Sequence, residues 1–575
     1  MVIDFSGTAG QVRTAFHTEI HNLVVNGKNH IANISDPQIP AALAAVVGIV
    51  SLHDFRPKSQ YTLLGPPCPI FSPQCYPVVP ADLATIFNFN PLFKLGLTGS
   101  GQAITVVEDA DLYSYNDWKT FRSKFGLSGY TGGSLTTVHP SPASGTNNCT
   151  DPGYDNYAET TLDAEWASAA TPDALIVVAS CKDTATFGFI IAAENLINQE
   201  SPPAIISMSY GECERANGTS ANAAINSAYQ QGVAEGVSIF IAAGDQDADV
   251  CDSNVPATQG LNVNAYASTP YNVAVGGTDF LDTYRGENST YWNSTNTSTY
   301  GSAKSYIPEM AWNDSCGSQL LAKWLRFSTT YGSSGLCNSP VARVLDTIFG
   351  FGLLTDAGGS GGPSSCAQAV PLLEGQPPVC IAGWPKPSWQ SGVVGIPKDG
   401  VRDLPDVSMF AGWLSPWGHA YVFCWSNGYS CSGAPSTWPM ASGTSFAAPI
   451  VAGIQALVNQ NWGSPQGNPN YAYYRLAATE YGKSGSKDCN SSRGNKVAST
   501  CIFYDVTAGD NDAPCTGTEN CYRPSGKYGV LSTSDSAYDP AYTATTGYDL
   551  ATGLGTINAY NLVVNWPFFV PCCGN

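Results

Sequence analysis

The sequence of 575 residues contains no run of about 18 apolar residues, the length that a membrane-spanning helix requires. Charged residues make up only 12% of the chain, with 25 Lys and Arg against 45 Asp and Glu. The formal net charge is -20, so we expect no basic surface able to neutralise nucleic-acid phosphates. The sequence therefore predicts neither membrane insertion nor nucleic-acid binding. With so few cations, protonation of the carboxylates in acid leaves only modest positive repulsion, which favours an acid-tolerant fold.

Histidine is also scarce, and this restricts the catalytic chemistry. After residue 56 the chain has only His139 and His419. Enzymes with a nucleophilic serine commonly use a histidine as the general base. His139 precedes a proline, and His419 lies in Trp417-Gly-His-Ala; neither has the His-Gly-Thr context that heads a helix, so we expect surface or structural roles. Asp109 would suit the aspartate of a Ser-His-Asp triad, but without a histidine that arrangement has no base.

No cysteine precedes Cys68, and the 18 cysteines include no C-x-x-C pair. Because histidines do not accompany them either, the pattern favours disulfides over zinc and an oxidising compartment, hence secretion. Close neighbours that suggest short loops are Cys68/Cys75, Cys366/Cys380, Cys424/Cys431, Cys489/Cys501 and Cys515/Cys521. No signal peptide is visible at Met1, so we expect the chain to begin inside a longer precursor.

Three regions are expected along the chain: 1–56, 57–80 and 81–575. In the first, Val12, Phe16, Ile20 and Leu23 follow a helical period, and a second helix is expected near Pro40–Val50. This region is too small for a strong core of its own and should dock on another unit. Residues 57–80 are rich in proline and predict a linker and possible cleavage region.

From about Pro80 the pattern becomes α/β. Short apolar runs typical of buried parallel strands alternate with helical stretches. The predicted strands are Gly101–Val107, Ala174–Ser180, Ala204–Met208 and Val237–Ala243, and the predicted helices are Tyr115–Phe125, Tyr157–Ala169, Thr186–Asn198 and Ser220–Glu235. This alternation predicts a parallel sheet flanked by helices, with ligands at the carboxyl ends of the strands.

A serine stands where a helix is predicted to begin. Ala441-Ser-Gly-Thr-Ser445 leads into an apolar helical pattern from Phe446 to Val458. Free backbone N–H groups at a helix N-terminus favour developing negative charge, which suits a nucleophile that attacks a carbonyl. The alternative is a small-residue helix start packed under a sheet. If Ser445 is the nucleophile, it needs a base.

A carboxylate can be that base in acid, where a histidine would be protonated. Glu159 and Asp163 are four residues apart and share one face of a predicted helix. Their repulsion separates their titrations and favours a shared proton, so Asp163 can orient Glu159. The alternative is an exposed acidic helix edge, which Glu165 would also fit.

A third carboxyl group follows the predicted strand Val237–Ala243. Asp245 lies at the end of that strand, where its side chain can face the nucleophile. In its protonated form it would donate a hydrogen bond to the oxyanion, whereas the ionised form would repel it. The alternative is metal ligation by Asp245, Asp247 and Asp249.

Together these residues resemble the sedolisin family of serine-carboxyl peptidases from about residue 80 onward. The matching stretches are Glu159-x-x-x-Asp163, Ser207-Met-Ser-Tyr-Gly211, Gly244-Asp245, Val275-Gly-Gly-Thr278, Glu309-Met-Ala-Trp312, Arg402-Asp-Leu-Pro-Asp-Val-Ser408 and Ser442-Gly-Thr-Ser445. Residues 1–56 resemble the C-terminal part of that family's activation prodomain, of the pro-kumamolisin type. The resemblance implies that Glu159 is the general base, Asp163 its partner, Asp245 the oxyanion donor and Ser445 the nucleophile.

The same resemblance implies a calcium site near the C-terminus. Its ligands would be the side chains of Asp505 and Asp549 and the carbonyls of Val506, Thr545 and Gly547, an all-oxygen set that suits Ca²⁺. A plain cluster of turns is the alternative. Asp245 and Ser445 are farther apart than is usual in the family, so we expect an insertion at Gly317–Gly362 that can reshape the cleft.

The sequence thus predicts an acid-active, secreted serine-carboxyl endopeptidase, synthesised as a zymogen and present here with part of its prodomain. Its partners would be protein or peptide substrates and its own prodomain, and nothing in the sequence requires more than a monomer. Two alternatives remain. One is a tripeptidyl-peptidase of the same family, and the other is a surface binding protein on a peptidase scaffold.

Overall fold

The computed structural model describes residues 5, 7–25, 27–35, 37–40, 49–64, 75–154, 158–184, 186–253, 255–349, 352–370, 379–534 and 536–567. Its centre is a sheet in the order β21-β25-β18-β12-β11-β9-β6-β8-β7. The strands from β7 to β25 in this order run parallel, while β21 and β13 add at β25 and β12 in antiparallel fashion. Their bounds are β6 Ala103–Glu108, β7 Ser134–Val138, β8 Leu175–Ser180, β9 Ile205–Met208, β11 Ser238–Ala242, β12 Val273–Phe280, β13 Glu309–Ala311, β18 Val407–Phe410, β21 Phe503–Tyr504 and β25 Thr556–Ile557.

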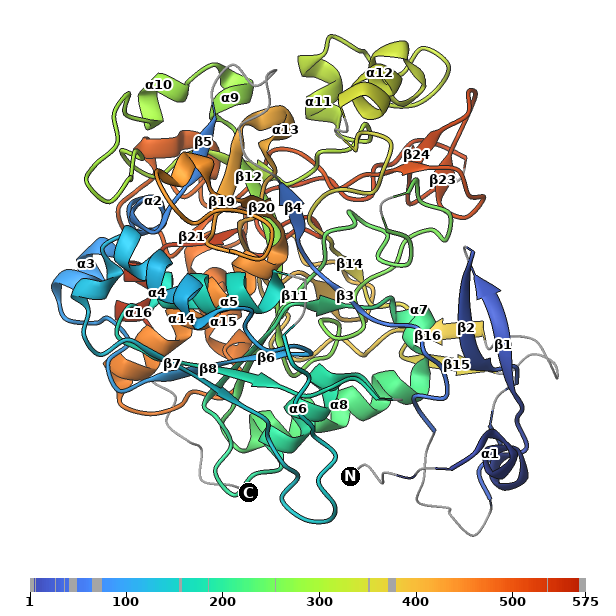
Figure 1. Ribbon diagram of the computed structural model, residues 1–575. Helices are drawn as coiled ribbons and strands as arrows, with labels where there is room; N and C mark the ends of the chain where they lie inside the picture. The colour runs from blue at the N-terminus through green and yellow to red at the C-terminus, as the bar shows by residue number, and fades with distance from the viewer. Residues whose placement is uncertain are drawn as a thin grey trace.

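Helices cover both faces of this sheet (Figure 1). The long apolar helix α14 (Thr444–Trp462) and α5 (Glu159–Ala170) pack side by side on one face, together with α4 (Tyr115–Lys124) and α16 (Ala559–Val564). On the other face lie α6 (Gly188–Ile197) and α8 (Thr219–Ala234). Successive side chains of β6 point to opposite faces of the sheet. Val106 packs in the apolar core under α5 and α14, and Val107 packs in the core under α6 and α8. The predicted α/β fold is confirmed.

The N-terminal region contains α1 (Ala9–Phe16) and a hairpin of β1 (Ile20–Val25) and β2 (Lys28–Asn33). The prediction that Ile20 and Leu23 continue the helix is therefore wrong. The helix ends at His17, which has a left-handed φ of 51°, and the next residues pair with β2 instead. Much of the second predicted helix, at residues 41–48, lies outside the described residues.

The linker does not lie free of the body. The strands β3 (Lys58–Ser59) and β4 (Thr62–Leu64) pair antiparallel with β10 (Tyr210–Gly211) and β20 (Met440–Ser442). In Figure 1 this blue segment crosses the front of the molecule between the N-terminal hairpin and the centre. Next to β20, the small sheet continues with β19 (His419–Val422) and β5 (Tyr76–Val78). Residues 65–74 lie outside the described residues.

Disulfides bridge many of the loops. Four of the five expected neighbouring pairs are bonded: Cys366–Cys380, Cys424–Cys431, Cys489–Cys501 and Cys515–Cys521. Cys68 of the fifth pair lies outside the described residues. Three bridges between more distant residues were not predicted: Cys149–Cys181, Cys213–Cys251 and Cys316–Cys337. In the part of the chain that the structure describes, no helix is long and apolar enough to cross a membrane.

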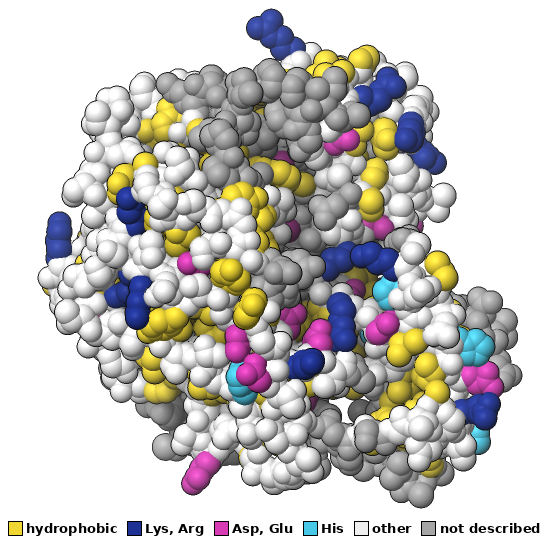
Figure 2. Space-filling model, viewed as in Figure 1, with side chains coloured by type: hydrophobic (Ala, Val, Ile, Leu, Met, Phe, Trp, Pro, Cys, Tyr) yellow, Lys and Arg dark blue, Asp and Glu magenta, His cyan; other side chains and the backbone are white. Residues whose placement is uncertain are grey.

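The region 317–362 forms a small lobe, drawn at the upper right of Figure 1, whose apolar core also includes Leu281, Met310, Trp417 and Val530. It carries α11 (Gln319–Trp324) and α12 (Pro340–Phe349) and is closed by the Cys316–Cys337 disulfide. The glycine-rich run that ends this region returns to the centre, where Gly358 N–H donates to the carbonyl of Asp245 at 3.2 Å. Figure 2 shows few charged side chains on the face in view, as the composition predicts.

The remaining elements are peripheral and mostly short. The helices are α2 (Pro80–Ile86), α3 (Asn90–Lys94), α7 (Glu214–Asn217), α9 (Asp282–Arg285), α10 (Asn288–Tyr291), α13 (Leu414–Trp417) and α15 (Asn470–Tyr481). The strands are β14 (Gly362–Pro363), β15 (Gln368–Val370), β16 (Val379–Ala382), β17 (Asp403–Leu404), β22 (Pro514–Cys515), β23 (Cys521–Tyr522) and β24 (Gly529–Leu531).

Candidate active site

Ser445 is the second residue of α14, directly after the turn at Gly443. It is fully buried, and its N–H donates to the carbonyl oxygen of Gln60 at 3.0 Å. Its Oγ lies 3.5 Å from the carbonyl oxygen of Ser209. Gly443 has a φ of 137°, and a Cβ there would stand 2.3 Å from the Gln60 oxygen. Only glycine leaves room for a peptide to lie against this turn.

Glu159 begins α5, and the packing of α5 on α14 brings its carboxyl group to the Ser445 side. Its side chain is buried, and neither carboxyl oxygen has a hydrogen bond of ordinary geometry within the described residues. Burial, reinforced by the charges of Asp163 and Glu108, holds the pKa of Glu159 well above its usual range, and only the Ser445 hydroxyl opposes this rise. The Glu159 carboxyl group therefore lies within electrostatic reach of Ser445 and Asp163.

Asp163 lies one turn further along α5 and accepts hydrogen bonds from Ser209 Oγ at 3.1 and 2.8 Å. Burial raises the pKa of Asp163 to about 8, although its interactions with Ser209, Glu108 and Glu159 favour the ionised form. The alternative of an exposed acidic helix edge is wrong. Glu159, Asp163 and Glu165 are all buried, and Glu165 accepts the N–H of Cys424 at 2.9 Å.

Glu108 forms a carboxyl cluster with Glu159 and Asp163. Its place in the site was not predicted from the sequence. It is fully buried at the end of β6, and its Oε2 accepts the Tyr210 hydroxyl at 2.9 Å. Burial and the charge of Asp163 hold the pKa of Glu108 well above its usual range. The same hydroxyl lies 2.9 Å from Asp109, which thus has a phenol rather than a histidine as its partner. The sequence signal that could have revealed Glu108 is its position as a charged residue at the carboxyl end of a buried parallel strand.

Asp245 follows β11 and faces the start of α14. Its Oδ1 accepts both the N–H and the hydroxyl of Thr444 at 2.8 Å. Its Oδ2 is buried without a partner in the described residues, and a Cβ on Gly443 would be 2.7 Å from it. Burial raises the pKa of Asp245 to about 7, although the Thr444 bonds oppose the rise. The Oδ2 and the Gln60 carbonyl oxygen thus both lie at Gly443.

The structure does not bring Asp245, Asp247 and Asp249 together as three metal ligands. Two groups of at least three His, Cys, Asp or Glu converge among the described residues, and neither contains these aspartates. One of the groups includes Cys424 and Cys431, which are bonded to each other. The metal alternative at Asp245 is therefore not supported.

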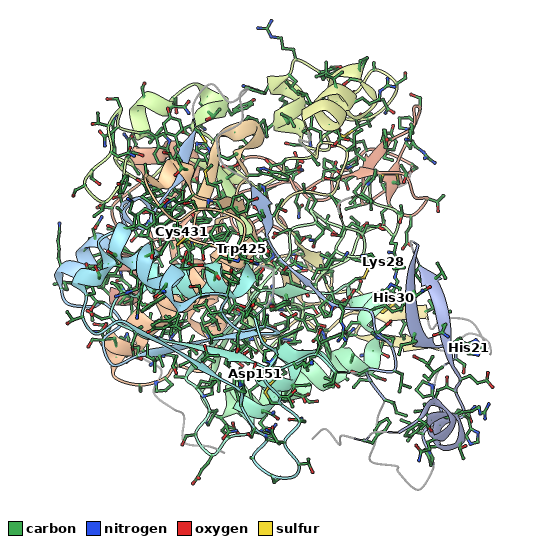
Figure 3. All side chains as sticks on the ribbon, in the orientation of Figure 1. His21, Lys28, His30, Asp151, Trp425 and Cys431 are labelled. Atoms are coloured by element: carbon green, nitrogen blue, oxygen red, sulfur yellow. A yellow bond between two sulfur atoms is a disulfide. The ribbon has the colours of Figure 1, made fainter. Side chains whose placement is uncertain are left out.

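His139 and His419, the two histidines after residue 56, lie in charge clusters. His419 is buried between Asp279 and Asp282, at 3.2 Å from each. Burial alone would lower the pKa of His419, but the charge of Asp282 and hydrogen bonds to both aspartates raise it to about 10. His139 lies 3.1 Å from Asp111 and 4.0 Å from Asp151, which is labelled in Figure 3. In the described residues no histidine makes a hydrogen bond to Ser445, and the surface or structural roles of His139 and His419 stay predictions.

The two predicted calcium-binding stretches lie side by side. The carboxyl oxygens of Asp505 accept the N–H of Gly547 at 3.1 and 3.2 Å, and Asp549 Oδ2 accepts the N–H of Thr545 at 2.9 Å. Both carboxyl groups are buried, and this burial raises the pKa of Asp505 to about 8 and that of Asp549 to about 7. The charge of Asp549 adds to the rise at Asp505. Two buried carboxylates that repel each other fit a hard cation, while their bonds to backbone N–H groups also fit a turn cluster.

Comparison with known proteins agrees with this geometry. Residues 1–55 match the family "Pro-kumamolisin, activation domain". Kumamolisin of Bacillus sp. (strain MN-32) is 27% identical over 537 residues, which cover 89% of this chain and 75% of that protein. Xanthomonalisin of Xanthomonas sp. (strain T-22) is 24% identical over 603 residues, which cover 97% of this chain and 56% of that protein.

Among solved structures, Pseudomonas sedolisin, a serine-carboxyl proteinase complexed with two molecules of pseudo-iodotyrostatin, superposes with a TM-score of 0.54. The sequence identity is 19%, and the match covers 85% of this chain and 98% of that one, so the two proteins share a fold. The activation-domain match and the relatives that align along most of the chain support the sedolisin family of serine-carboxyl peptidases, and the chain shares the fold of a solved sedolisin.

Proposed function

We propose that the protein is an acid-active, secreted serine-carboxyl endopeptidase that cleaves peptide bonds with Ser445, Glu159, Asp163 and Asp245. One observation carries the proposal. The buried carboxyl group of Glu159 lies within electrostatic reach of Ser445 and Asp163 and has no hydrogen-bond partner of its own in the described residues, whereas no histidine there is hydrogen-bonded to that serine. A base of this type works where a histidine would be protonated.

The reaction follows from the positions of these groups. Ser445 Oγ attacks the substrate carbonyl carbon while Glu159 takes its proton, and Glu159 then returns the proton to the leaving amine. Water hydrolyses the acyl-enzyme by the same route in reverse. The Ser445 N–H and a protonated Asp245 Oδ2 stabilise the oxyanion, since the N–H already binds a carbonyl oxygen beside Gly443.

The buried carboxyl groups favour activity in acid. Glu108, Asp163 and Glu159 cannot all ionise side by side in a buried site, so the cluster retains protons above the ordinary carboxyl range. A single negative charge shared by the cluster leaves Glu159 able to accept a proton from Ser445. As the pH rises through about 7, Asp245 ionises and would repel the oxyanion.

An endopeptidase needs a cleft that accepts a chain from both directions. Residues 58–64 pass through the site without a break, and the chain continues upstream to Arg56, whose guanidinium lies 3.2 Å from Asp183. A tripeptidyl-peptidase would require a barrier three residues before the reacting bond. The continuous path past that point supports internal cleavage.

We further propose a calcium ion held by Asp505, Asp549 and the carbonyls of Val506, Thr545 and Gly547. When bound, the ion would compensate the charge of the two buried carboxylates and stabilise the loops that carry them. Secretion is proposed because the seven disulfides among the described residues require an oxidising compartment.

The test is hydrolysis of an unfolded protein at acidic pH by the full chain and by its Ser445→Ala variant. The wild type should produce internal fragments of many lengths, and the variant none. Retained hydrolysis in the variant would overturn the mechanism, and release of tripeptides alone would overturn the endopeptidase assignment.

A further inference from the structure

Residues 58–64 lie across the candidate active site as an extended chain. On one side of Ser445, Ser59 and Lys58 pair antiparallel with Tyr210 and Gly211 of β10. On the other side, Thr62 to Leu64 pair antiparallel with β20, the strand that leads into the Ser445 turn. Strand addition of this kind is how a cleft holds an extended peptide. Gln60 and Tyr61 are the residues between the two pairings, so the bond that joins them lies at the serine.

The Gln60 backbone is held on both sides. Its N–H donates to the Ser209 carbonyl at 2.9 Å, and its carbonyl oxygen accepts the Ser445 N–H at 3.0 Å. A Cβ on Gly443 would be 2.3 Å from that oxygen, 2.7 Å from Tyr61 Cα and 2.7 Å from Asp245 Oδ2. The carbonyl therefore occupies the position in which an oxyanion would form, next to the unpartnered oxygen of Asp245.

The Gln60 side chain is buried, and both polar atoms of its amide are hydrogen-bonded. It is 1% exposed, its Oε1 accepts the Asp245 N–H at 3.1 Å, and its Nε2 donates to the Lys58 carbonyl at 2.7 Å. A Cβ on Gly211 would stand 2.4 Å from this Nε2, so the glycine of the Ser207–Gly211 motif makes space for the amide. The pocket before the reacting bond thus takes a neutral amide and provides a donor for it.

Tyr61 is placed on the opposite side of the bond. Its hydroxyl accepts the N–H of Ala158 at 2.9 Å, and Ala158 directly precedes Glu159. The residue that would carry the new amine is therefore held against the start of the helix that bears the proposed proton donor. The strand β4 then fixes the chain that follows.

Upstream, the N-terminal lobe is attached to the residues just before this segment. His30 of the β1–β2 hairpin, labelled in Figure 3, lies 3.1 Å from Asp54 and stacks on Phe55 with ring centroids 4.4 Å apart. Arg56 pairs with Asp183 at 3.2 Å and lies over the Phe187 ring at 5.4 Å. The lobe is thus anchored on the upstream side of the Gln60–Tyr61 bond, and one cut would separate it from the peptidase body.

We infer that the Gln60–Tyr61 peptide bond is the maturation bond of this zymogen and that Ser445 of the same molecule cleaves it. The inference rests on the proposed function. Ser445 Oγ adds to the Gln60 carbonyl carbon as Glu159 takes its proton. The Gln60–Tyr61 C–N bond then breaks, and the Tyr61 nitrogen takes the proton from Glu159. Water hydrolyses the Gln60 ester and restores Ser445, which leaves a Gln60 carboxylate and a new N-terminus at Tyr61.

The experiment follows the full chain after it is moved from neutral to acidic pH, with samples stopped at early times. N-terminal sequencing and intact mass should give a first product that begins Tyr61-Thr-Leu-Leu. Its rate of formation should not change over a 100-fold dilution, because the reaction is intramolecular. Ser445→Ala, shown to be folded by circular dichroism, should stay intact under the same conditions.

Two further variants test the position of the bond. Gln60→Ala loses the hydrogen bond to the Asp245 N–H and should mature about tenfold more slowly, as expected for one buried hydrogen bond. Gln38→Ala, in the same N-terminal fragment but exposed, is the matched control and should mature at the wild-type rate. A synthetic peptide of residues 55–64 added to the matured enzyme should be cut between Gln60 and Tyr61.

A first N-terminus other than Tyr61, a rate proportional to protein concentration, or processing of Ser445→Ala alone would overturn the inference. Hydrolysis of an added unfolded protein, measured in the same samples, separates this failure from that of the proposed function. If the added protein is digested but Tyr61 is not the first N-terminus, only the maturation bond is wrong. If neither reaction occurs in folded wild-type protein, both proposals fail.

Discussion

Replacing Glu159 by glutamine would remove the proposed base and leave the packing of the site almost unchanged. The side chain is buried at the start of α5, within electrostatic reach of Asp163 and Ser445. Glutamine has the same shape as a protonated glutamate but cannot take a proton. The variant therefore separates loss of proton transfer from loss of structure.

General-base removal costs about 100- to 10,000-fold in rate, which is about 3–5 kcal/mol of transition-state stabilisation. We expect the kcat of Glu159→Gln to fall by this amount. The thermal stability of Glu159→Gln should not fall with its kcat. Burial raises the pKa of Glu159 well above its usual range, so the ionised form is costly in the folded state, and the neutral amide should unfold at the same or a higher temperature near neutral pH.

The assay compares kcat on one peptide substrate and the thermal midpoint for three proteins. Glu165→Gln is the matched control, because Glu165 is equally buried on the same helix but accepts the Cys424 N–H instead of facing Ser445. It should retain near-wild-type kcat. If Glu159→Gln kept more than about a tenth of the wild-type kcat, it would refute a role for Glu159 as the base.

Three other expectations follow from the buried carboxyl groups. Asp245→Ala should lower kcat about 100- to 1,000-fold, and Asp245→Asn, which keeps a neutral donor, should lower it less; kcat at acidic pH checks this. Burial raises the pKa of Asp82 to about 6 and that of Glu309 to about 7, so the folded state binds more protons than the unfolded state between those values and about 4. The free energy of unfolding of Ser445→Ala, measured in urea, should therefore be highest near about pH 4 and fall as the pH rises to about 7. Chelation should lower the thermal midpoint, by the equivalent of about 3 kcal/mol if calcium had been present at about 100 times its dissociation constant, and Asp505→Asn should abolish that dependence.

The sequence predicted the central α/β layers closely because those segments are apolar on both faces. The strands β6, β8, β9 and β11 and the helices α5 and α14 begin within two residues of their predicted starts. Near the N-terminus, by contrast, Ile20 and Leu23 fit a helical period as well as they fit a strand. These residues form the strand β1 because they pair with β2, and no local sequence pattern shows that pairing.

For the candidate site, the predicted residues were those with a local motif. Glu159, Asp163, Asp245 and Ser445 each lie in a recognisable stretch, and the fold brings all four to one place. Glu108 was missed because a single acidic residue at a strand end is not a motif.

The roles of Gln60 and Tyr61 were also missed, for a different reason. Their position depends on pairing with β10 and β20, which lie far away in sequence. Sequence patterns report local periodicity and not the course of a linker over a surface.

The most direct test of the central claim is the pH dependence of peptide hydrolysis by the matured enzyme, from about pH 2.5 to 8, a range that brackets carboxyl and histidine titration. The Ser445→Ala variant provides the blank. A carboxylate base with a protonated Asp245 predicts a maximum in the acidic range and loss of activity as the pH approaches about 7, where Asp245 ionises. Maximal activity at neutral pH would contradict the account, since it would require a base other than the Glu159 cluster.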